Sequence, residues 1–215
     1  GVPLDKESAE AAEFYRPPDD APEIIYLKEK RQKLGGYIPN RTLSCPSLII
    51  PELERFGNFL DSSKEREMST TGIMVRLLAS LLKLTEVQRY IVPIVPDEAR
   101  TFGMEGLFQA AGIYSPQGQL YQSLDGDSLM PYREAEDGQI LQEGITEVGA
   151  IASFMAAGSA YSVHGLPMIP FYFFYSMFGM QRVGDMIWSC GDMMCKGFLL
   201  GGTAGRTTLN GEGLQ

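Results

Sequence analysis

Two kinds of side chain that serve many catalytic and metal sites are scarce in this sequence. It holds only three cysteines, Cys45, Cys190 and Cys195, and a single histidine, His164. An odd number of cysteines without metal-type spacing argues against a disulfide framework, and it indicates buried or free thiols in a reducing compartment. His164 precedes Gly165 in an expected turn, without the partners of a triad or a metal site. We therefore expect structural cysteines and no catalytic histidine.

Positive charge and long apolar runs are also in short supply. The formal net charge is −9, and a nucleic-acid binder needs a basic surface to neutralise phosphates. The longest apolar run, 166–180, has fifteen residues and contains Pro167, Pro170 and Gly179, which is too short and too broken for a membrane span. Residues 1–13 are polar and acidic, unlike a signal peptide. We expect a cytoplasmic protein without a nucleic-acid or membrane partner.

Charge is especially sparse in the last 77 residues, from 139 to 215, which carry eight charged side chains. Such a stretch is expected to be mostly interior or interface. A carboxylate is costly to bury unless it is paired or protonated. Each acidic residue in this stretch therefore requires a structural or functional explanation. The eight residues are Arg182, Lys196 and Arg206 among the bases, and Glu143, Glu147, Asp185, Asp192 and Glu212 among the acids.

Strand-like and helix-like patterns alternate along the chain from residue 69 onward. Ser69 precedes a helix whose apolar side runs from Ile73 to Leu82. Short apolar runs then predict strands, and longer stretches with apolar or small residues predict helices. The expected strands are 90–95, 139–143, 168–175 and 197–200, and the expected helices between them are 102–111, 147–161 and 178–194. This order predicts an α/β fold with a largely parallel sheet.

The first 68 residues have a different character. Prolines and acids in 1–22 indicate a linker or a surface arm. A helix is expected over 23–34, an extended crossing over 37–47 and a short helix over 51–60. We expect residues 1–68 to be a linker arm with helices that leads from another, N-terminal domain, and residues 69–215 to be the α/β domain. Within that domain, 114–137 is polar and rich in turns, which indicates a surface excursion.

Acids, aromatic residues and glycines follow the ends of the predicted strands. Open parallel sheets bind ligands beyond the carboxyl ends of their strands, so these residues are candidates for a site. Each also has an ordinary structural explanation, since the helix dipole favours an acid in a first turn and aromatic residues commonly fill a core. The candidates are Asp97, Glu98, Gly144, Glu147, Tyr175, Phe178, Gly201, Gly202, Arg206 and Glu212.

Two further patterns do not predict a site. The glycine-rich tail, 201–215, lacks both the Gly-Lys-Ser/Thr of a P-loop and a GxGxxG fingerprint, which argues against nucleotide binding. The segment 125–127, Asp-Gly-Asp, is similar to the first positions of an EF-hand calcium loop. The later ligands of such a loop are missing from the sequence that follows, so we interpret the segment as a turn.

Six stretches of the sequence carry the motifs of a known family. Four are long, DEARTFGMEGLF (97–108), GQILQEGITEVGA (138–150), LPMIPFYFFYSMFGMQRVGDMIW (166–188) and GFLLGGTAGRTTLNGEGLQ (197–215), and STTG (69–72) and YREAEDG (132–138) support them. Together they resemble the homodimeric-type pyruvate dehydrogenase family, the thiamine-diphosphate-dependent first component of the pyruvate dehydrogenase complex. The resemblance is dense from about residue 69 onward. It implies a parallel-sheet α/β domain of the pyrimidine-binding type, preceded by an extended linker and incomplete at its C-terminus.

The resemblance implies a role for Glu147. In this family a glutamate of the ILQEGITE motif hydrogen-bonds a ring nitrogen of the cofactor's aminopyrimidine, and that glutamate falls on Glu147. The bond favours the tautomer that activates the cofactor, which then serves as the electron sink for pyruvate decarboxylation. A carboxylate in an apolar setting can share a proton with a weakly basic nitrogen. We therefore expect sparsely charged surroundings for Glu147.

The resemblance also implies roles for other site residues. Tyr175 matches a tyrosine that contacts the substrate-derived adduct, and Phe178 matches an aromatic residue that packs on the pyrimidine. Asp97 and Glu98 match acids near the active-site entrance. Glu212 matches an acid close to a catalytic histidine that would follow Gln215, which places the end of this sequence inside an active-site loop.

The family's other requirements are not found in this sequence. The Mg²⁺ and diphosphate site belongs to another domain with a Gly-Asp-Gly motif, and the cofactor lies at the interface of a homodimer. The resemblance implies a parent pyruvate dehydrogenase (acetyl-transferring) that takes pyruvate and acetylates the lipoyl domain of a dihydrolipoyl acetyltransferase. Because this chain would supply one wall of the cofactor site, we expect it to be inactive alone.

Two alternatives remain open at this point. One is a non-catalytic interaction module with the same fold, and the other is a fragment of another transketolase-like thiamine enzyme. Glu147, Tyr175 and Glu212 are all present, which argues against a module that has lost its chemistry. The motifs GMEGLF and FYFFYSMFGMQR resemble pyruvate dehydrogenase more than other thiamine enzymes.

Overall fold

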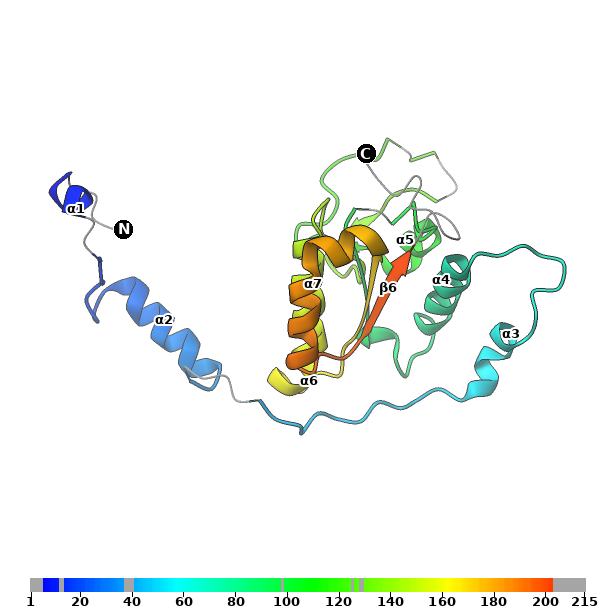
Figure 1. Cartoon of the computed structure of the whole chain (residues 1–215), viewed down its shortest axis with the longest axis horizontal. Coiled ribbons are helices and arrows are strands. Elements are labelled where there is room, and N and C mark those ends of the chain that lie inside the picture. The colour runs from blue at the N-terminus through cyan, green and yellow to red at the C-terminus, as the bar shows by residue number, and fades with distance from the viewer. Residues whose placement is uncertain are drawn as a thin grey trace. The chain divides into compact units, whose positions relative to one another are not determined.

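A computed structural model describes residues 6–11, 14–36, 41–97, 99–124, 126–127 and 130–202 (Figure 1). The chain divides into two compact units, Gly1–Arg41 and Thr42–Gln215. Each unit is considered by itself below.

The first unit contains the helices α1 (Lys6–Ala11) and α2 (Pro22–Lys33). The helix predicted over 23–34 is therefore confirmed. Proline is well tolerated in the first turn, where its missing N–H has no helical partner, and the basic residues of the last turn complement the helix dipole. Gly35 and Gly36 follow with φ values of 91° and 109°, which a residue with a side chain rarely adopts. No residue of α2 is buried within this unit.

The second unit begins with an irregular stretch and a short helical turn. Residues 42–52 form no helix or strand, and η1 (Leu53–Phe56) and α3 (Gly57–Leu60) follow as a 3₁₀ turn and one α turn. The longer helix α4 (Thr70–Leu81) begins at the predicted cap, because Ser69 Oγ accepts a hydrogen bond from Gly72 N at 3.0 Å.

A parallel sheet organises the rest of this unit. Its four strands lie in the order β4-β1-β5-β6, and every pairing is parallel, which confirms the predicted α/β fold. The central strands are β1 (Ile91–Val95) and β5 (Ile169–Tyr175). At the edges, β4 (Leu141–Gln142) is shorter than the predicted 139–143, and β6 (Phe198–Gly202) is two residues longer than predicted at its carboxyl end.

Shorter elements connect β1 to β4. They are η3 (Glu105–Leu107), α5 (Phe108–Ala111), β2 (Ile113–Tyr114) and β3 (Glu134–Ala135). A further short turn, η2 (Gln88–Tyr90), precedes β1 and leads into it. The strands β2 and β3 form a small parallel ladder of their own. The predicted surface excursion over 114–137 therefore begins and ends at this ladder.

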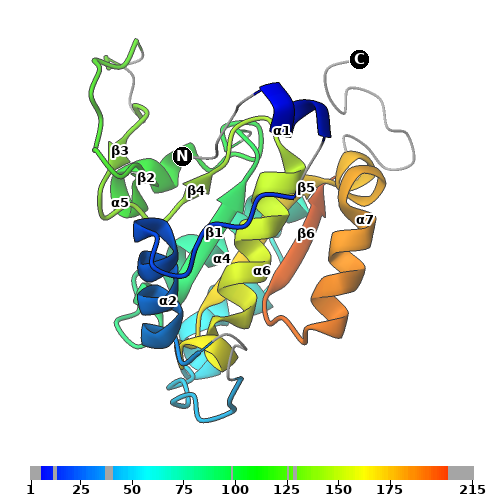
Figure 2. The ribbon, with the colours of Figure 1, turned by 90° about the vertical axis from the view of Figure 1, so that its left-hand side faces the viewer.

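Helices cover the two faces of the sheet (Figure 2). Alternate side chains of a strand point to opposite faces, so neighbours along β1 and β5 belong to different cores. Ile91, Val95, Phe171 and Phe173 pack with α4 and the segment from 99 to 113. Ile94, Tyr172 and Phe174 pack instead with α6 (Glu147–Val163) and α7 (Ser176–Asp192). The strands are thus buried on both sides, as parallel strands usually are.

Each of the two helices of the second core follows a strand, α7 directly after β5 and α6 after a short turn that leaves β4. Helix α6 begins at the predicted residue, capped by Thr146, whose Oγ1 accepts from Gly149 N at 3.2 Å. Helix α7 begins at Ser176, two residues before the predicted start, so Tyr175 is its N-cap. It bends at Val183, where φ is −131° and ψ is 19°, and Figure 1 shows its two segments running in different directions. Among the described residues, no helix is long and apolar enough to cross a membrane.

Candidate functional site

Three of the predicted site residues lie where strands end and helices begin. Tyr175 is the last residue of β5, and Phe178 lies in the first turn of α7. Glu147 is the first residue of α6, which follows β4 after a short turn. The strands are parallel, so these junctions share one edge of the sheet, where open α/β folds bind ligands.

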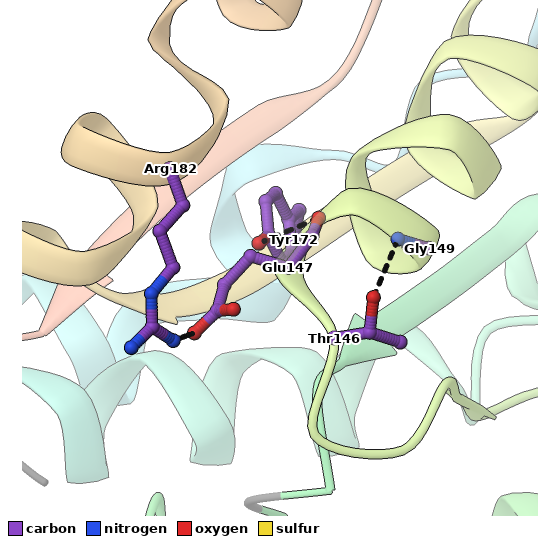
Figure 3. Close-up of polar contacts among 5 residues, drawn as sticks. All are labelled: Thr146, Glu147, Gly149, Tyr172 and Arg182. Atoms are coloured by element: carbon purple, nitrogen blue, oxygen red, sulfur yellow. Dashed lines mark hydrogen bonds and ion pairs between the residues drawn. The ribbon is translucent and has the colours of Figure 1, made fainter.

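Glu147 is held at the start of α6 with its side chain only 13% exposed (Figure 3). Its Oε1 accepts a hydrogen bond from Arg182 Nη1 at 2.7 Å, and its backbone carbonyl accepts one from the Tyr172 hydroxyl at 3.5 Å. Burial, followed by the nearby charge of Glu147, raises the pKa of Tyr172 well above its usual range, so this hydroxyl remains a donor at neutral pH.

The surroundings of Glu147 differ from the sequence expectation in one respect. Sparse charge was expected there, but the carboxylate forms an ion pair with Arg182. Sequence reasoning did not select Arg182, although it is one of only three basic residues after residue 138. Its spacing from Phe178 is i to i+4, which places both side chains on one face of α7. The sequence held that signal, but the contact with Glu147 depends on how α7 packs beside α6.

Aromatic rings extend the site from Arg182 to the core. The Arg182 Cζ atom lies over the Phe178 ring, 4.8 Å from its centroid. The Phe178 and Tyr175 rings meet edge to face with centroids 6.4 Å apart, and the Tyr175 ring packs 5.2 Å from that of Phe102. Glu147, Arg182, Phe178 and Tyr175 therefore form one continuous row of contacts.

Asp97 belongs to a second polar group at the ends of β1 and β4. Its Oδ1 accepts a hydrogen bond from Gln142 Nε2 at 2.8 Å, and the same amide lies 3.0 Å from the Tyr132 hydroxyl. Asp97 has a φ of 45°, a left-handed conformation that aspartate tolerates better than most residues. Burial raises the pKa of Tyr132 well above its usual range, and the charge of Glu134 adds to this effect. None of the hydrogen bonds described for this group reaches Glu147.

Two predicted site residues, Glu98 and Glu212, lie outside the described residues, as does Arg206. The other acids of the charge-poor stretch have simple environments: Glu143 accepts a hydrogen bond from Ser153, and Asp185 and Asp192 are exposed. Within the described part of the chain, no three His, Cys, Asp or Glu side chains come together as a metal site would require.

A cavity of about 340 Å³ adjoins the aromatic row. It lies between the start of α4 and the end of β6, and Phe102 forms part of its wall. Because Phe102 also packs on Tyr175, the cavity and the row of site residues share one side chain. Its other lining residues are Thr70, Thr71, Met74, Phe173, Leu199, Leu200, Gly201 and Gly202.

These features define a class of protein. It is a parallel α/β domain with a carboxylate and an aromatic platform at the carboxyl edge of its sheet, an arrangement that fits a pyrimidine-binding domain. The profile of the family described as the pyruvate dehydrogenase E1 component middle domain matches residues 48–215. The chain belongs to this family.

Curated relatives agree along the whole chain. The pyruvate dehydrogenase E1 component of Pseudomonas aeruginosa is 54% identical over 214 residues, and that of Escherichia coli K12 is 51% identical over 215 residues. The E1 component of Corynebacterium glutamicum is 48% identical over 219 residues. Each match covers 100% of this chain and 24% of the relative, so the chain spans about a quarter of the length of these proteins.

Proposed function

We propose that this chain is the pyrimidine-binding part of a pyruvate dehydrogenase (acetyl-transferring). The whole enzyme would use thiamine diphosphate to decarboxylate pyruvate and would reductively acetylate a lipoyl group. The observation that carries the proposal is the meeting of Glu147, Phe178 and Tyr175 in one row at the carboxyl edge of the sheet. Relatives named pyruvate dehydrogenase E1 component support it.

The residues present fit an aminopyrimidine. Glu147 accepts an N–H at 2.7 Å, and the ring of Phe178 carries a planar group over its face at 4.8 Å. An aminopyrimidine is also planar, and its ring nitrogen can share a proton with a carboxylate. The donor and the planar group in this structure both come from Arg182, so the site accommodates a flat cation that donates hydrogen bonds.

Each residue would have a defined task. Thiamine diphosphate, when bound, supplies the electron sink for decarboxylation. Glu147 would hold a proton at the ring nitrogen through Oε1, and Phe178 would orient the ring by packing on its face. Tyr175 would present its phenol toward the substrate. The remaining proposed positions are Asp97 and Glu98 at the entrance to the site and Glu212 beside the reacting groups.

Other parts of the enzyme would complete the site. Mg²⁺ and the diphosphate would be held by another domain, and the cofactor would lie between two subunits of a homodimer. The lipoyl domain of a dihydrolipoyl acetyltransferase would accept the acetyl group, in the cytoplasm. In this proposal residues 1–68 are the linker arm and residues 69–215 the pyrimidine-binding domain. The chain alone would be inactive.

The test is Glu147→Gln in the full-length protein. Glutamine has the same shape but cannot take up the proton, so turnover should fall by about 100-fold or more, the range for losing a group that manages a proton. Circular dichroism should remain that of the wild type. Glu136→Gln, an exposed change that also removes one negative charge, should retain wild-type turnover. Wild-type turnover in Glu147→Gln would refute the role of Glu147 and favour a non-catalytic module.

A further inference from the structure

Helix α7 ends in a motif that brings two cysteines together. Met194 adopts a left-handed conformation with φ 54°, and the chain turns back on the helix there. Cys195 N donates to Cys190 O at 2.9 Å, and Met194 N donates to Gly191 O at 2.9 Å. These two bonds are those of a Schellman motif, whose first and last residues commonly make an apolar side-chain contact. At this helix end the two residues are Cys190 and Cys195, and both belong to the core beneath α7.

The two side chains are close enough to be joined. Burial raises the pKa of the Cys190 thiol, and the charge of Cys195 and a hydrogen bond between the two thiols add to this effect. The backbone bond between the same residues limits the separation of their Cα atoms to about 6.8 Å, given standard bond lengths. Disulfides span Cα separations of about 4.4–6.8 Å. No backbone movement is therefore needed to bring these two residues within the range of a disulfide.

Helix α6 holds this turn from the other side. Lys196 N donates to Gly158 O at 2.9 Å, and the Tyr161 hydroxyl donates to Met194 O at 3.1 Å. A Cβ atom added to Gly158 would stand 3.0 Å from Cys195 Cβ, so the turn lies tightly against the helix. The backbone around Cys195 is thus fixed by hydrogen bonds and by packing, and rotation of the two side chains would suffice to join their sulfur atoms.

We propose that Cys190 and Cys195 form a reversible dithiol–disulfide site, which cross-links the end of α7 to the turn after it in the presence of a disulfide oxidant. The inference is independent of the proposed function, because it uses no residue of the proposed cofactor site. In a reducing compartment the two residues would remain thiols, and disulfides of intracellular proteins are usually transient. The site is therefore compatible with the absence of a disulfide framework that the cysteine content indicates.

The reaction is a thiol–disulfide exchange with an oxidant of the type R–S–S–R. Cys195, which is partly exposed, loses its proton and attacks one sulfur of the oxidant. A mixed disulfide forms, and the R–S⁻ that leaves takes up a proton. Cys190 then loses its proton and attacks Cys195 Sγ, which breaks the mixed disulfide and releases a second R–SH. Two protein thiols are oxidised to one disulfide, and the oxidant is reduced to two R–SH.

Burial determines the order of the two attacks. Cys190 is 5% exposed and burial raises its pKa to about 12, so an oxidant in solution reacts first with Cys195. At pH 8 only about one part in 10⁴ of Cys190 is thiolate. The second attack is intramolecular, however, and well-oriented groups reach effective concentrations of about 10⁵ M or more. Proximity therefore outweighs the scarcity of thiolate, and the internal disulfide replaces the mixed one.

The test measures the redox state of one peptide of the full-length protein. Trypsin cleavage after Arg182 and Lys196 releases residues 183–196, which contain both cysteines, whereas Cys45 is the only cysteine of the peptide 42–55. The native protein is equilibrated with mixtures of reduced and oxidised glutathione, trapped with N-ethylmaleimide, digested and measured by mass spectrometry. The peptide 183–196 should become two hydrogens lighter and carry no maleimide as the oxidised fraction rises. The peptide 42–55 should carry only maleimide or glutathione.

A comparison with the unfolded protein shows whether the fold favours the disulfide. The equilibrium constant for oxidation of 183–196 should be at least about ten-fold larger in the native protein than in urea, because the fold holds the two thiols together. In the native oxidised protein, hydrogen exchange should also slow in peptides that cover 190–200. An equilibrium constant no larger than in urea would overturn the inference, and unchanged exchange would refute the cross-link as a constraint on the end of α7.

Two variants distinguish a pair from a single reactive thiol. Cys190→Ala should stop at the mixed disulfide of Cys195 with glutathione, and Cys195→Ala should leave Cys190 unmodified in the native protein. The wild-type result decides even if a variant fails to fold. Glutathione on the wild-type peptide 183–196 without the internal disulfide would overturn the inference, and so would maleimide on both cysteines in every mixture. Either result would leave the pair as an ordinary apolar contact of the helix end.

Discussion

The ring of Phe174 lies so close to Gly179 that a side chain at residue 179 would collide with it. A Cβ atom added to Gly179 would stand 2.2 Å from Phe174 Cδ2, far inside van der Waals contact. Phe174 is 4% exposed and packs in the core under α6 and α7, so it has little room to move. The first turns of α7 lie against β5 because residue 179 has no side chain, and Phe178 is held at the adjacent position.

Gly179→Ala should therefore displace the start of α7. Overpacking of this kind costs about 1–3 kcal/mol. In the full-length protein, hydrogen exchange measured by mass spectrometry should accelerate in peptides that cover 176–183. Affinity for thiamine diphosphate should also fall in this variant, because the displaced helix start moves Phe178, which is proposed to pack on the pyrimidine. The matched control is Gly184→Ala in the same helix, where an added Cβ meets nothing within 4 Å. Equal exchange in the two variants would contradict this account of the Phe174 contact.

Helices α6 and α7 show which parts of the structure could be predicted from the sequence and which could not. The spacing of apolar residues and the local composition predicted β5 and a following helix. A buried parallel strand is a continuous apolar run, and the helix carries an apolar stripe. Glu147 was predicted at the start of its helix, and Thr146 does cap it there. The Arg182 contact was not predicted. It depends on the packing of α7 beside α6 and on the bend at Val183, which no local pattern encodes.

The edge strands illustrate a second limit. The pattern 139–143 is longer than β4, because only two residues of that run, Leu141 and Gln142, pair with β1. Glu143 N still bonds Val95 O, so the chain leaves the sheet gradually at this end. The bounds of an edge strand are set by where its neighbour ends, and that information lies elsewhere in the sequence.

Asp97 should tolerate asparagine but not alanine. Its φ of 45° is a left-handed conformation, which asparagine adopts readily and alanine at a cost of about 1–2 kcal/mol. Asparagine also keeps an oxygen that can accept from Gln142 Nε2, which lies 2.8 Å away in the wild type. Hydrogen exchange in peptides covering 93–104 should be near wild type in Asp97→Asn and faster in Asp97→Ala. If the two substitutions have the same effect, backbone conformation is not what selects aspartate here.

Cys190 should resist alkylation while the protein is folded. Cys195 N bonds Cys190 O at 2.9 Å, and Met194, with φ 54°, closes the end of α7, so the two thiols lie together under the helix terminus. Burial raises the pKa of the Cys190 thiol to about 12, with Cys195 as the next cause. At pH 8 the reactive thiolate is then about one part in 10⁴. Iodoacetamide followed by peptide mapping should label Cys190 only in urea, and rapid labelling of the native protein would show that the thiol is accessible and ionised.

Tyr175 offers a way to separate packing from chemistry in the proposed enzyme. Its ring packs 5.2 Å from that of Phe102 and meets the Phe178 ring at 6.4 Å, so a phenylalanine should keep both contacts. Tyr175→Phe in the full-length protein should therefore bind thiamine diphosphate with wild-type affinity. If the phenol contacts the substrate, kcat/KM for pyruvate should fall by about ten-fold or more, the loss expected for a hydrogen bond to a charged group. Tyr175→Leu removes the ring as well, and it should weaken cofactor binding by disturbing Phe178. Unchanged pyruvate kinetics in Tyr175→Phe would restrict Tyr175 to a packing role, because the only group that variant lacks is the hydroxyl.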